Sequence, residues 1–150
     1  MANIGNPMRT VASTLDAVAH CTGFAAAQAR AMGFSPARTR EVELAVEEVV
    51  ANICRYGFVD ALGEVELGCR RIDNDKLEFE FIDQGQPFDM LAAPDPMLTS
   101  DLEKRDLGGL GIRMLRALVD DATYRREDGR NVLRLIVHAP CRLGPDHSKT

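Results

Sequence analysis

The clearest helical pattern in the chain runs over residues 35–58. Ser35 is a suitable N-cap, and Pro36 suits the first helical position, where its missing N–H costs nothing. Gly57 closes the pattern and predicts a left-handed C-cap. Branched apolar residues recur between these ends at helical spacing, at Val42, Val46, Val49, Val50 and Ile53. The pattern therefore predicts one half-buried helix with defined ends.

Two polar residues lie at the margin of this apolar stripe. Glu48 and Asn52 are four residues apart, so they lie one above the other on the same side of the helix. Asn52 is expected nearer the core and Glu48 nearer the solvent. A carboxylate and an amide in this place could line a cleft. A solvated flank and a capping side chain are the more common explanations of such residues, so the helix alone does not establish a site.

Residues 11–32 predict a second helix, because alanine is abundant there and favours helix. Its expected packed side consists of Leu15, Val18, Ala19, Phe24, Ala27 and Ala31. Gly23 is a weak point within it. Residues 1–10 contain a glycine and a proline and predict at most an edge strand.

After Gly57 the hydrophobic period changes from helical to alternating. Residues 64–72 and 77–82 alternate apolar and polar positions as half-buried strands do. Residues 122–126 and 132–138 predict two more strands. Short turns join them in two antiparallel hairpins. The order of elements predicts a single α+β domain over residues 1–150. We expect a two-layer α/β sandwich with a mixed, mostly antiparallel sheet, covered by helices on one face.

A long segment rich in proline and charge separates the two hairpins. Residues 89–107 predict a loop with at most one short helical turn, and loops of this length are usually functional or disordered. The glycine-rich turn at 108–111 then precedes a helical pattern at 112–119. Backbone N–H groups at such a junction attract phosphate. The turn lacks the features of a P-loop or a dinucleotide fingerprint, and a plain loop-to-helix junction explains it equally well.

Asp83 ends the second predicted strand, two residues before Gly85. Its carboxylate could accept hydrogen bonds from a ligand amino group in a partly apolar pocket, since a buried carboxylate usually has a partner. An ordinary Asx turn explains the same residues. Lys104 and Arg105 precede the glycine-rich turn and could either reach phosphates or solvate the loop.

Composition narrows the classes of function. The net charge is −5, and no Lys/Arg cluster is long enough to follow a nucleic-acid backbone, so direct nucleic-acid binding is not expected. The four cysteines and three histidines show no metal-ligand spacing, which indicates a reducing, cytoplasmic setting. We expect no signal peptide and no membrane span, because no stretch approaches 18 apolar residues.

Three of these segments, in this order, resemble the nucleotide-binding boxes of the GHKL ATPases (gyrase, Hsp90, histidine kinase and MutL relatives). Glu48-x-x-x-Asn52 resembles the N box. Asp83-x-Gly85-x-Pro87-Phe88 resembles the G1 box, and Gly108-Gly109-Leu110-Gly111 resembles the G2 box. The resemblance covers about residues 35–137. The small size, the wording of the G1 box and the short lid resemble bacterial anti-sigma-factor serine kinases of the RsbW and SpoIIAB type.

The resemblance implies a Bergerat fold that holds Mg²⁺-ATP between the helices and a lid. Asn52 would be the Mg²⁺ ligand, and Glu48 would be the general base acting on the attacking hydroxyl; the four-residue spacing to Asn52 favours Glu48 over Glu47. Asp83 would bind the adenine amino group, and Arg105 would contact the γ-phosphate. The remaining implied nucleotide contacts are Gly85, Phe88, Gly108, Gly109, Leu110, Gly111 and Ile112.

The implied function is that of an anti-sigma factor with protein serine/threonine kinase activity. It would bind a sigma factor and phosphorylate a STAS-type anti-anti-sigma partner, as a cytoplasmic homodimer. A second hypothesis is a nucleotide-gated module that sequesters a regulator with little or no kinase activity; Glu48 is present in both. A third, the ATPase domain of a sensor kinase, needs a phosphoacceptor histidine helix, and the helix around His20 shows no such motif.

Overall fold

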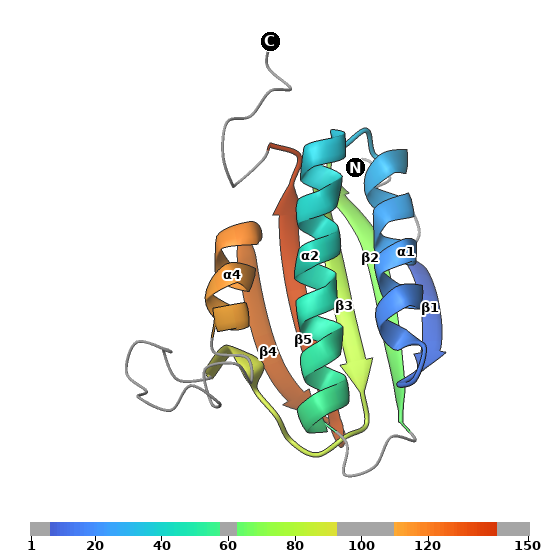
Figure 1. Ribbon diagram of the computed structural model, residues 1–150, viewed down its shortest axis with the longest axis vertical. Helices are drawn as coiled ribbons and strands as arrows, with labels where there is room; N and C mark the ends of the chain where they lie inside the picture. The colour runs from blue at the N-terminus through green and yellow to red at the C-terminus, as the bar shows by residue number, and fades with distance from the viewer. Residues whose placement is uncertain (1–6, 58–62, 93–109, 141–150) are drawn as a thin grey trace.

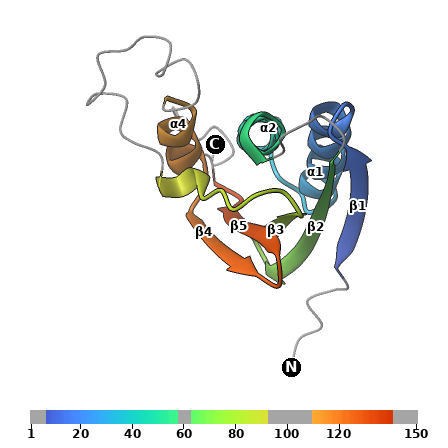
Figure 2. The ribbon, with the colours of Figure 1, turned by 90° about the horizontal axis from the view of Figure 1, so that it is seen from below.

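The computed structural model describes residues 7–57, 63–92 and 110–140. Helices cover one face of a sheet in two layers, with α2 between α1 and α4 (Figures 1 and 2). The predicted α+β sandwich is thus confirmed. The elements, in chain order, are β1 (Met8–Ser13), α1 (Ala17–Ala31), α2 (Pro36–Asn52), the π-helical turn η1 (Ile53–Gly57), β2 (Glu64–Asp73), β3 (Lys76–Asp83), the 3₁₀ turn η2 (Met90–Ala92), α4 (Leu110–Leu118), β4 (Asp121–Glu127) and β5 (Arg130–His138).

The five strands are ordered β1-β2-β3-β5-β4, and each neighbouring pair is antiparallel. Both predicted hairpins are confirmed, as β2–β3 and β4–β5. No parallel pair occurs among the described strands, so the sheet there is not mixed. The β3–β5 pair joins strands that are distant in sequence, and it places Asp83 opposite Asn131.

The core lies between the inner face of the sheet and the helices. All five residues of the α2 stripe are buried, as predicted. Alternate residues of the central strands meet them, namely Val65, Leu67, Phe79, Phe81, Leu133 and Leu135. Each such side chain contributes about 1.5–3 kcal/mol by leaving water. The core therefore fixes the inward face of β3, which ends at Asp83.

The predicted start of α2 is confirmed, but its predicted end is wrong. The Ser35 hydroxyl accepts the backbone N–H of Arg38 at 3.1 Å, as an N-cap does. Beyond Asn52 the chain continues as η1, and Gly57 is not among the glycines with positive φ. Its carbonyl accepts the N–H of Gln86 at 2.8 Å, so the end of η1 is bonded to the loop after β3.

The predicted packed side of the first helix is largely wrong. Residues 8–13 form an edge strand against β2, so α1 begins only at Ala17. Leu15 is 79% exposed, and Ala19, Ala27 and Ala31 are exposed as well. Val18 and Phe24 are partly buried. The buried side consists of small residues, at Ala17, Cys21, Ala25, Ala26 and Ala29, which let α1 approach α2 closely.

The glycine-rich turn is shorter than predicted, because α4 already begins at Leu110. Leu110 and Gly111 therefore belong to the first turn of the helix. Arg105, Gly108 and Gly109 lie outside the described residues. The 3₁₀ turn η2 agrees with the short helical turn expected after residue 89.

A buried arginine joins the start of α2 to the ends of α4 and β5. The Arg38 side chain is fully buried and donates to Glu41 at 2.8 Å and to Asp120 at 3.0 Å. It also donates to the carbonyls of Leu118, at 2.6 Å, and His138, at 2.7 Å. A buried charge needs such a complete set of partners. Arg38 thereby fixes the end of α4 against α2.

The cysteines described by the structure are free thiols, as expected of small core residues. Burial raises the pKa of Cys21 to about 11 and that of Cys69 to about 12. These thiols stay protonated at neutral pH and take no part in the chemistry discussed below.

Candidate functional site

Glu48 and Asn52 lie one turn apart near the end of α2. Asn52 is 3% exposed, whereas Glu48 is partly exposed and Glu47 is exposed. The predicted order of burial along this side of the helix is confirmed. The Asn52 Nδ2 donates to the Glu48 carbonyl and to Glu48 Oε2, both at 2.7 Å. The amide therefore sets the position of the carboxylate through Nδ2, and its Oδ1 takes no part in these two bonds.

The Glu48 carboxylate packs directly against the first turn of α4. A Cβ built on Gly111 would lie 1.9 Å from Glu48 Oε2 and 2.2 Å from its Cδ. Only glycine allows this approach. Negative charge is favourable at the start of a helix, where backbone N–H groups are unpaired. The structure thus brings together the predicted N box and the described part of the predicted G2 box.

Asp83 is a buried carboxylate at the end of β3, with 4% of its surface exposed. Its Oδ1 accepts the N–H of Gly85 at 2.9 Å and the amide of Asn131 at 3.0 Å. The Asx turn and the partnered buried acid are therefore both present. Burial raises the pKa of Asp83, although these two bonds and the charge of Arg126 partly offset that effect. Oδ2 is the oxygen that these bonds leave for a ligand.

Gly85 allows the loop after β3 to touch the end of η1. A Cβ at Gly85 would lie 2.0 Å from the carbonyl oxygen of Gly57. The neighbouring Gln86 N–H bonds to that same oxygen, and Arg126 donates to the Gly85 carbonyl at 2.8 Å. The two backbones therefore form one wall beside the Asp83 carboxylate.

Phe88 supplies an apolar surface near this wall. Its ring lies 5.3 Å from that of Tyr56, centroid to centroid, in a tilted arrangement. Gln86 donates to the Tyr56 carbonyl at 2.8 Å, which ties the loop to η1 a second time. Ile112 is 5% exposed and packs in the core, so its side chain supports α4. An apolar ring near one buried carboxylate suits a planar base that carries an amino group.

Sequence reasoning missed Asn131, Tyr124 and Arg126. Asn131 is 5% exposed and stands at the start of β5, opposite Asp83. Tyr124 donates to its Oδ1 at 2.5 Å. An asparagine within a strand is unusual, because this residue type is depleted there, and this was the available signal. Its meaning depends on the pairing of β3 with β5, which no local pattern indicates.

The described residues fit a nucleotide and a magnesium ion in the chemistry of their donor groups. Amide and carboxylate oxygens, as in Asn52 and Glu48, are the ligands that Mg²⁺ prefers. Within the described ranges no group of three or more His, Cys, Asp or Glu side chains could hold a metal. A cation here would depend on phosphate oxygens for its other ligands, as Mg²⁺ commonly does.

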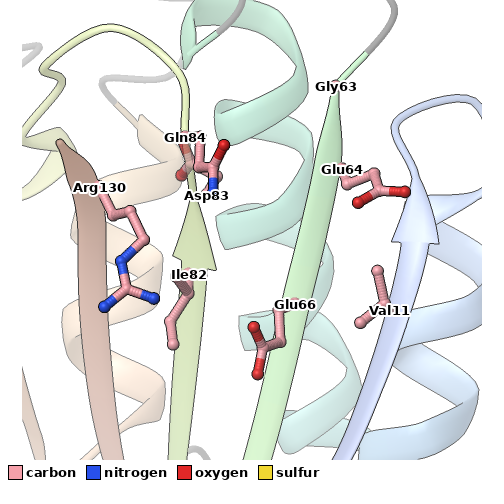
Figure 3. Close-up of a pocket in the computed structure, with 8 residues that line it drawn as sticks. All are labelled: Val11, Gly63, Glu64, Glu66, Ile82, Asp83, Gln84 and Arg130. Atoms are coloured by element: carbon pink, nitrogen blue, oxygen red, sulfur yellow. The ribbon is translucent and has the colours of Figure 1, made fainter.

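A separate hollow of about 480 Å³ lies on the opposite, helix-free face of the sheet (Figure 3). Its lining residues are Val11, Gly63, Glu64, Glu66, Ile82, Asp83, Gln84 and Arg130. Figure 3 views this face with α2 behind the sheet. Arg9 pairs with Glu66 at 2.6 Å nearby. The Asp83 carboxylate is bonded on the helix side, so this hollow is distinct from the site around Glu48 and Asn52.

These features define an ATPase domain of the histidine kinase type, and the chain belongs to that family. The family model described as "Histidine kinase-like ATPase domain" matches residues 11–137. Membership implies a binding site for ATP. Among the residues that the structure describes, no helix is long and apolar enough to cross a membrane.

The chain is similar to serine-protein kinases called RsbW. It is 28% identical over 106 residues to that of Listeria innocua, covering 67% of each chain. It is 26% identical over 109 residues to that of Bacillus cereus, covering 70% of this chain and 68% of the relative.

Solved structures share the fold. The RsbU and RsbW domains of Rv1364c from Mycobacterium tuberculosis give a TM-score of 0.64 at 16% identity, with 95% of this chain matched. This chain spans about a third, 35%, of that longer chain. The catalytic domain of the histidine kinase ThkA gives a TM-score of 0.53 at 11% identity, matching 88% of this chain and 96% of the domain.

Proposed function

We propose that this protein is an anti-sigma factor with protein serine/threonine kinase activity, which binds Mg²⁺-ATP and phosphorylates a STAS-type anti-anti-sigma partner. The observation that carries the proposal is the place of the Glu48 carboxylate, between the amide of Asn52 and the backbone of Gly111. An acid is thereby held at the start of the helix that the resemblance assigns to phosphate binding.

The base of ATP would bind beside Asp83. The carboxylate Oδ2 accepts the adenine amino group, while Oδ1 stays bonded within the protein. Gly85 keeps the loop close to η1, and Phe88 adds apolar surface. A largely buried acceptor discriminates strongly between ligands, because a ligand without a donor at this position leaves the acceptor without a hydrogen bond.

The phosphates would lie against the first turn of α4, on the backbone of Gly108, Gly109, Leu110, Gly111 and Ile112, with Arg105 at the γ-phosphate. Bound Mg²⁺ supplies charge neutralisation between phosphate oxygens. Asn52 would hold it through Oδ1, since its Nδ2 is engaged by Glu48.

Glu48 would act on the incoming hydroxyl of the partner's serine or threonine. Phosphoryl transfer needs little covalent chemistry from the protein, so positioning of the nucleophile carries much of the catalysis. A carboxylate within hydrogen-bond reach of the hydroxyl can orient it and accept its proton. Asn52 holds Glu48 in place for that role.

The partners follow from the similarity to RsbW serine kinases. A protein with a STAS domain would supply the hydroxyl, and a sigma factor would be bound in alternation with it. We propose a homodimer in the cytoplasm, with ATP hydrolysis or transfer deciding which partner is held.

The alternative is a nucleotide-gated module that sequesters a regulator with little kinase activity. In such a module the bond from Asn52 and the packing on Gly111 would keep the Glu48 carboxylate from an incoming hydroxyl. Such a protein would bind nucleotide and partner normally without transferring phosphate.

Transfer of labelled phosphate from Mg²⁺-ATP to purified STAS-domain proteins of the same organism tests the proposal. We expect transfer by the parent and at least a hundredfold loss in Glu48→Gln, with ATP affinity kept. Glu47→Gln is the matched control, because Glu47 is the exposed neighbour on the same helix. Normal ATP binding by the parent without transfer to any STAS protein would favour the sequestering module.

A further inference from the structure

The amide of Asn131 has all its hydrogen-bonding capacity used inside the protein. Its Nδ2 donates to Asp83 Oδ1 at 3.0 Å and to the Gln86 carbonyl at 2.8 Å. Its Oδ1 accepts the N–H of Phe88 at 3.2 Å and the hydroxyl of Tyr124 at 2.5 Å. An asparagine side chain offers two donors and two acceptor sites. Asn131 therefore has no group to offer a ligand.

These four bonds also determine which way the amide points. If nitrogen and oxygen were exchanged, an acceptor would face the oxygens of Asp83 and Gln86, and a donor would face the N–H of Phe88. All three contacts would then be repulsive, so the network permits a single orientation. Asn131 thus always presents a donor to Asp83.

We propose that Asn131 is a positioning residue that makes the base site selective for an amino group over a carbonyl, and so for 6-aminopurines over 6-oxopurines. This inference rests on the nucleotide-binding function proposed above. The donors of Asn131 and Gly85 converge on Asp83 Oδ1 and favour the ionised, acceptor-only carboxylate. Oδ2 then meets an amino group favourably and the carbonyl of a 6-oxopurine unfavourably.

The groups around Asp83 show how the selectivity can be altered. From β4, Arg126 and Tyr124 face this region, and from η1 the thiol of Cys54 lies within electrostatic range. Asn131→Asp would place a second carboxylate 3.0 Å from Asp83 Oδ1 without changing the shape. Two carboxylates so close share one proton. The pair would then have a proton to donate to a 6-oxo group, and it would lose this proton as the pH rises.

The test measures the dissociation constants of ATP and ITP, which differ at the 6-position, at pH 6.5 and 8.5. We expect the parent to prefer ATP, and Asn131→Asp to reduce that preference at least tenfold at pH 6.5. In Asn131→Asp the ITP affinity should fall as the pH rises and the shared proton is lost, which a loss of packing alone would not produce. Val137→Ala is the control, because it removes buried volume from the same strand away from the site. It should keep the parent's ATP/ITP ratio.

An unchanged ATP/ITP ratio in Asn131→Asp would overturn the inference while leaving the proposed function intact. Failure of the parent to bind ATP would instead overturn the proposed function. Asn131→Ala, which removes the donor, should also lower the ratio. If neither variant folds, hydrogen exchange of the parent's side-chain amides decides: slow exchange at Asn131 relative to the exposed Asn74 supports the network, and equal rates overturn it.

Discussion

Replacement of Gly85 by alanine should severely destabilise the protein, because the obstacle to a new methyl group is backbone. The added Cβ would lie 2.0 Å from the Gly57 carbonyl oxygen and 2.7 Å from its carbon. Ordinary contact begins at 3.4 Å, so the loop and η1 would have to separate by about 1.4 Å. Neither segment can yield by rotating a side chain.

The magnitude follows from the bonds that such a separation breaks. Overpacking of this kind costs about 1–3 kcal/mol. The bond from Gln86 N to the Gly57 oxygen, at 2.8 Å, would break, and that from Gly85 N to Asp83, at 2.9 Å, would weaken. Each contributes about 0.5–1.5 kcal/mol. We expect Gly85→Ala to lower the free energy of unfolding by about 2–4 kcal/mol.

Urea denaturation followed by circular dichroism measures this difference. Gly23→Ala is the matched control: it lies within α1 with no atom inside 4 Å of the new Cβ. It should raise the free energy of unfolding by about 0.5–1 kcal/mol, since alanine favours helix. If Gly85→Ala unfolded within about 0.5 kcal/mol of the parent, the close approach of the two backbones would be refuted.

Three further variants address the site. In Gly111→Ala the new methyl group would contact the end of the flexible Glu48 side chain, so the free energy of unfolding should change by less than about 1 kcal/mol. Phosphate transfer should fall at least tenfold, because the Glu48 carboxylate is displaced. An unaltered transfer rate would contradict the packing of Glu48 on α4. Because burial raises the pKa of Asp83, the parent loses stability as the pH rises through that pKa. Asp83→Asn carries no such charge, so its free energy of unfolding relative to the parent should increase from pH 4 to 7. Urea titrations measure this difference. A constant difference across this range would contradict it. Asn52→Ala should weaken ATP binding in Mg²⁺ but not in EDTA, measured by calorimetry; equal losses in both would remove Asn52 from the metal site.

The parts of the fold that depend on local chemistry were predictable. The N-cap at Ser35, the apolar stripe of α2 and the two hairpins all follow from spacing and turn residues that are neighbours in sequence. The side-by-side places of Glu48 and Asn52 follow from helix geometry alone. Asp83 and Gly85 were found because a strand ends there in an acid and a glycine.

The parts that depend on long-range packing were not predictable. The buried face of α1 follows from its close approach to α2, so small residues such as Ala25 and Ala29 are buried there, while the large apolar Leu15 lies exposed before the helix begins. The end of η1 at Gly57 is bonded to Gln86, in a loop nearly thirty residues later. The roles of Arg38 and Asn131 likewise appear only when distant segments meet.

The pairing of β3 with β5 has a consequence for the order of folding. Asp83 and Asn131 are 48 residues apart in sequence, and they meet only in this register. Closing so long a loop costs entropy before any contact is gained, and non-local pairings of this kind form slowly. A nascent chain that does not yet include β5 contains α2 and the β2–β3 hairpin but lacks Asn131, the partner of Asp83. ATP would therefore bind and stabilise the complete fold, and it would not assist the earlier steps of folding.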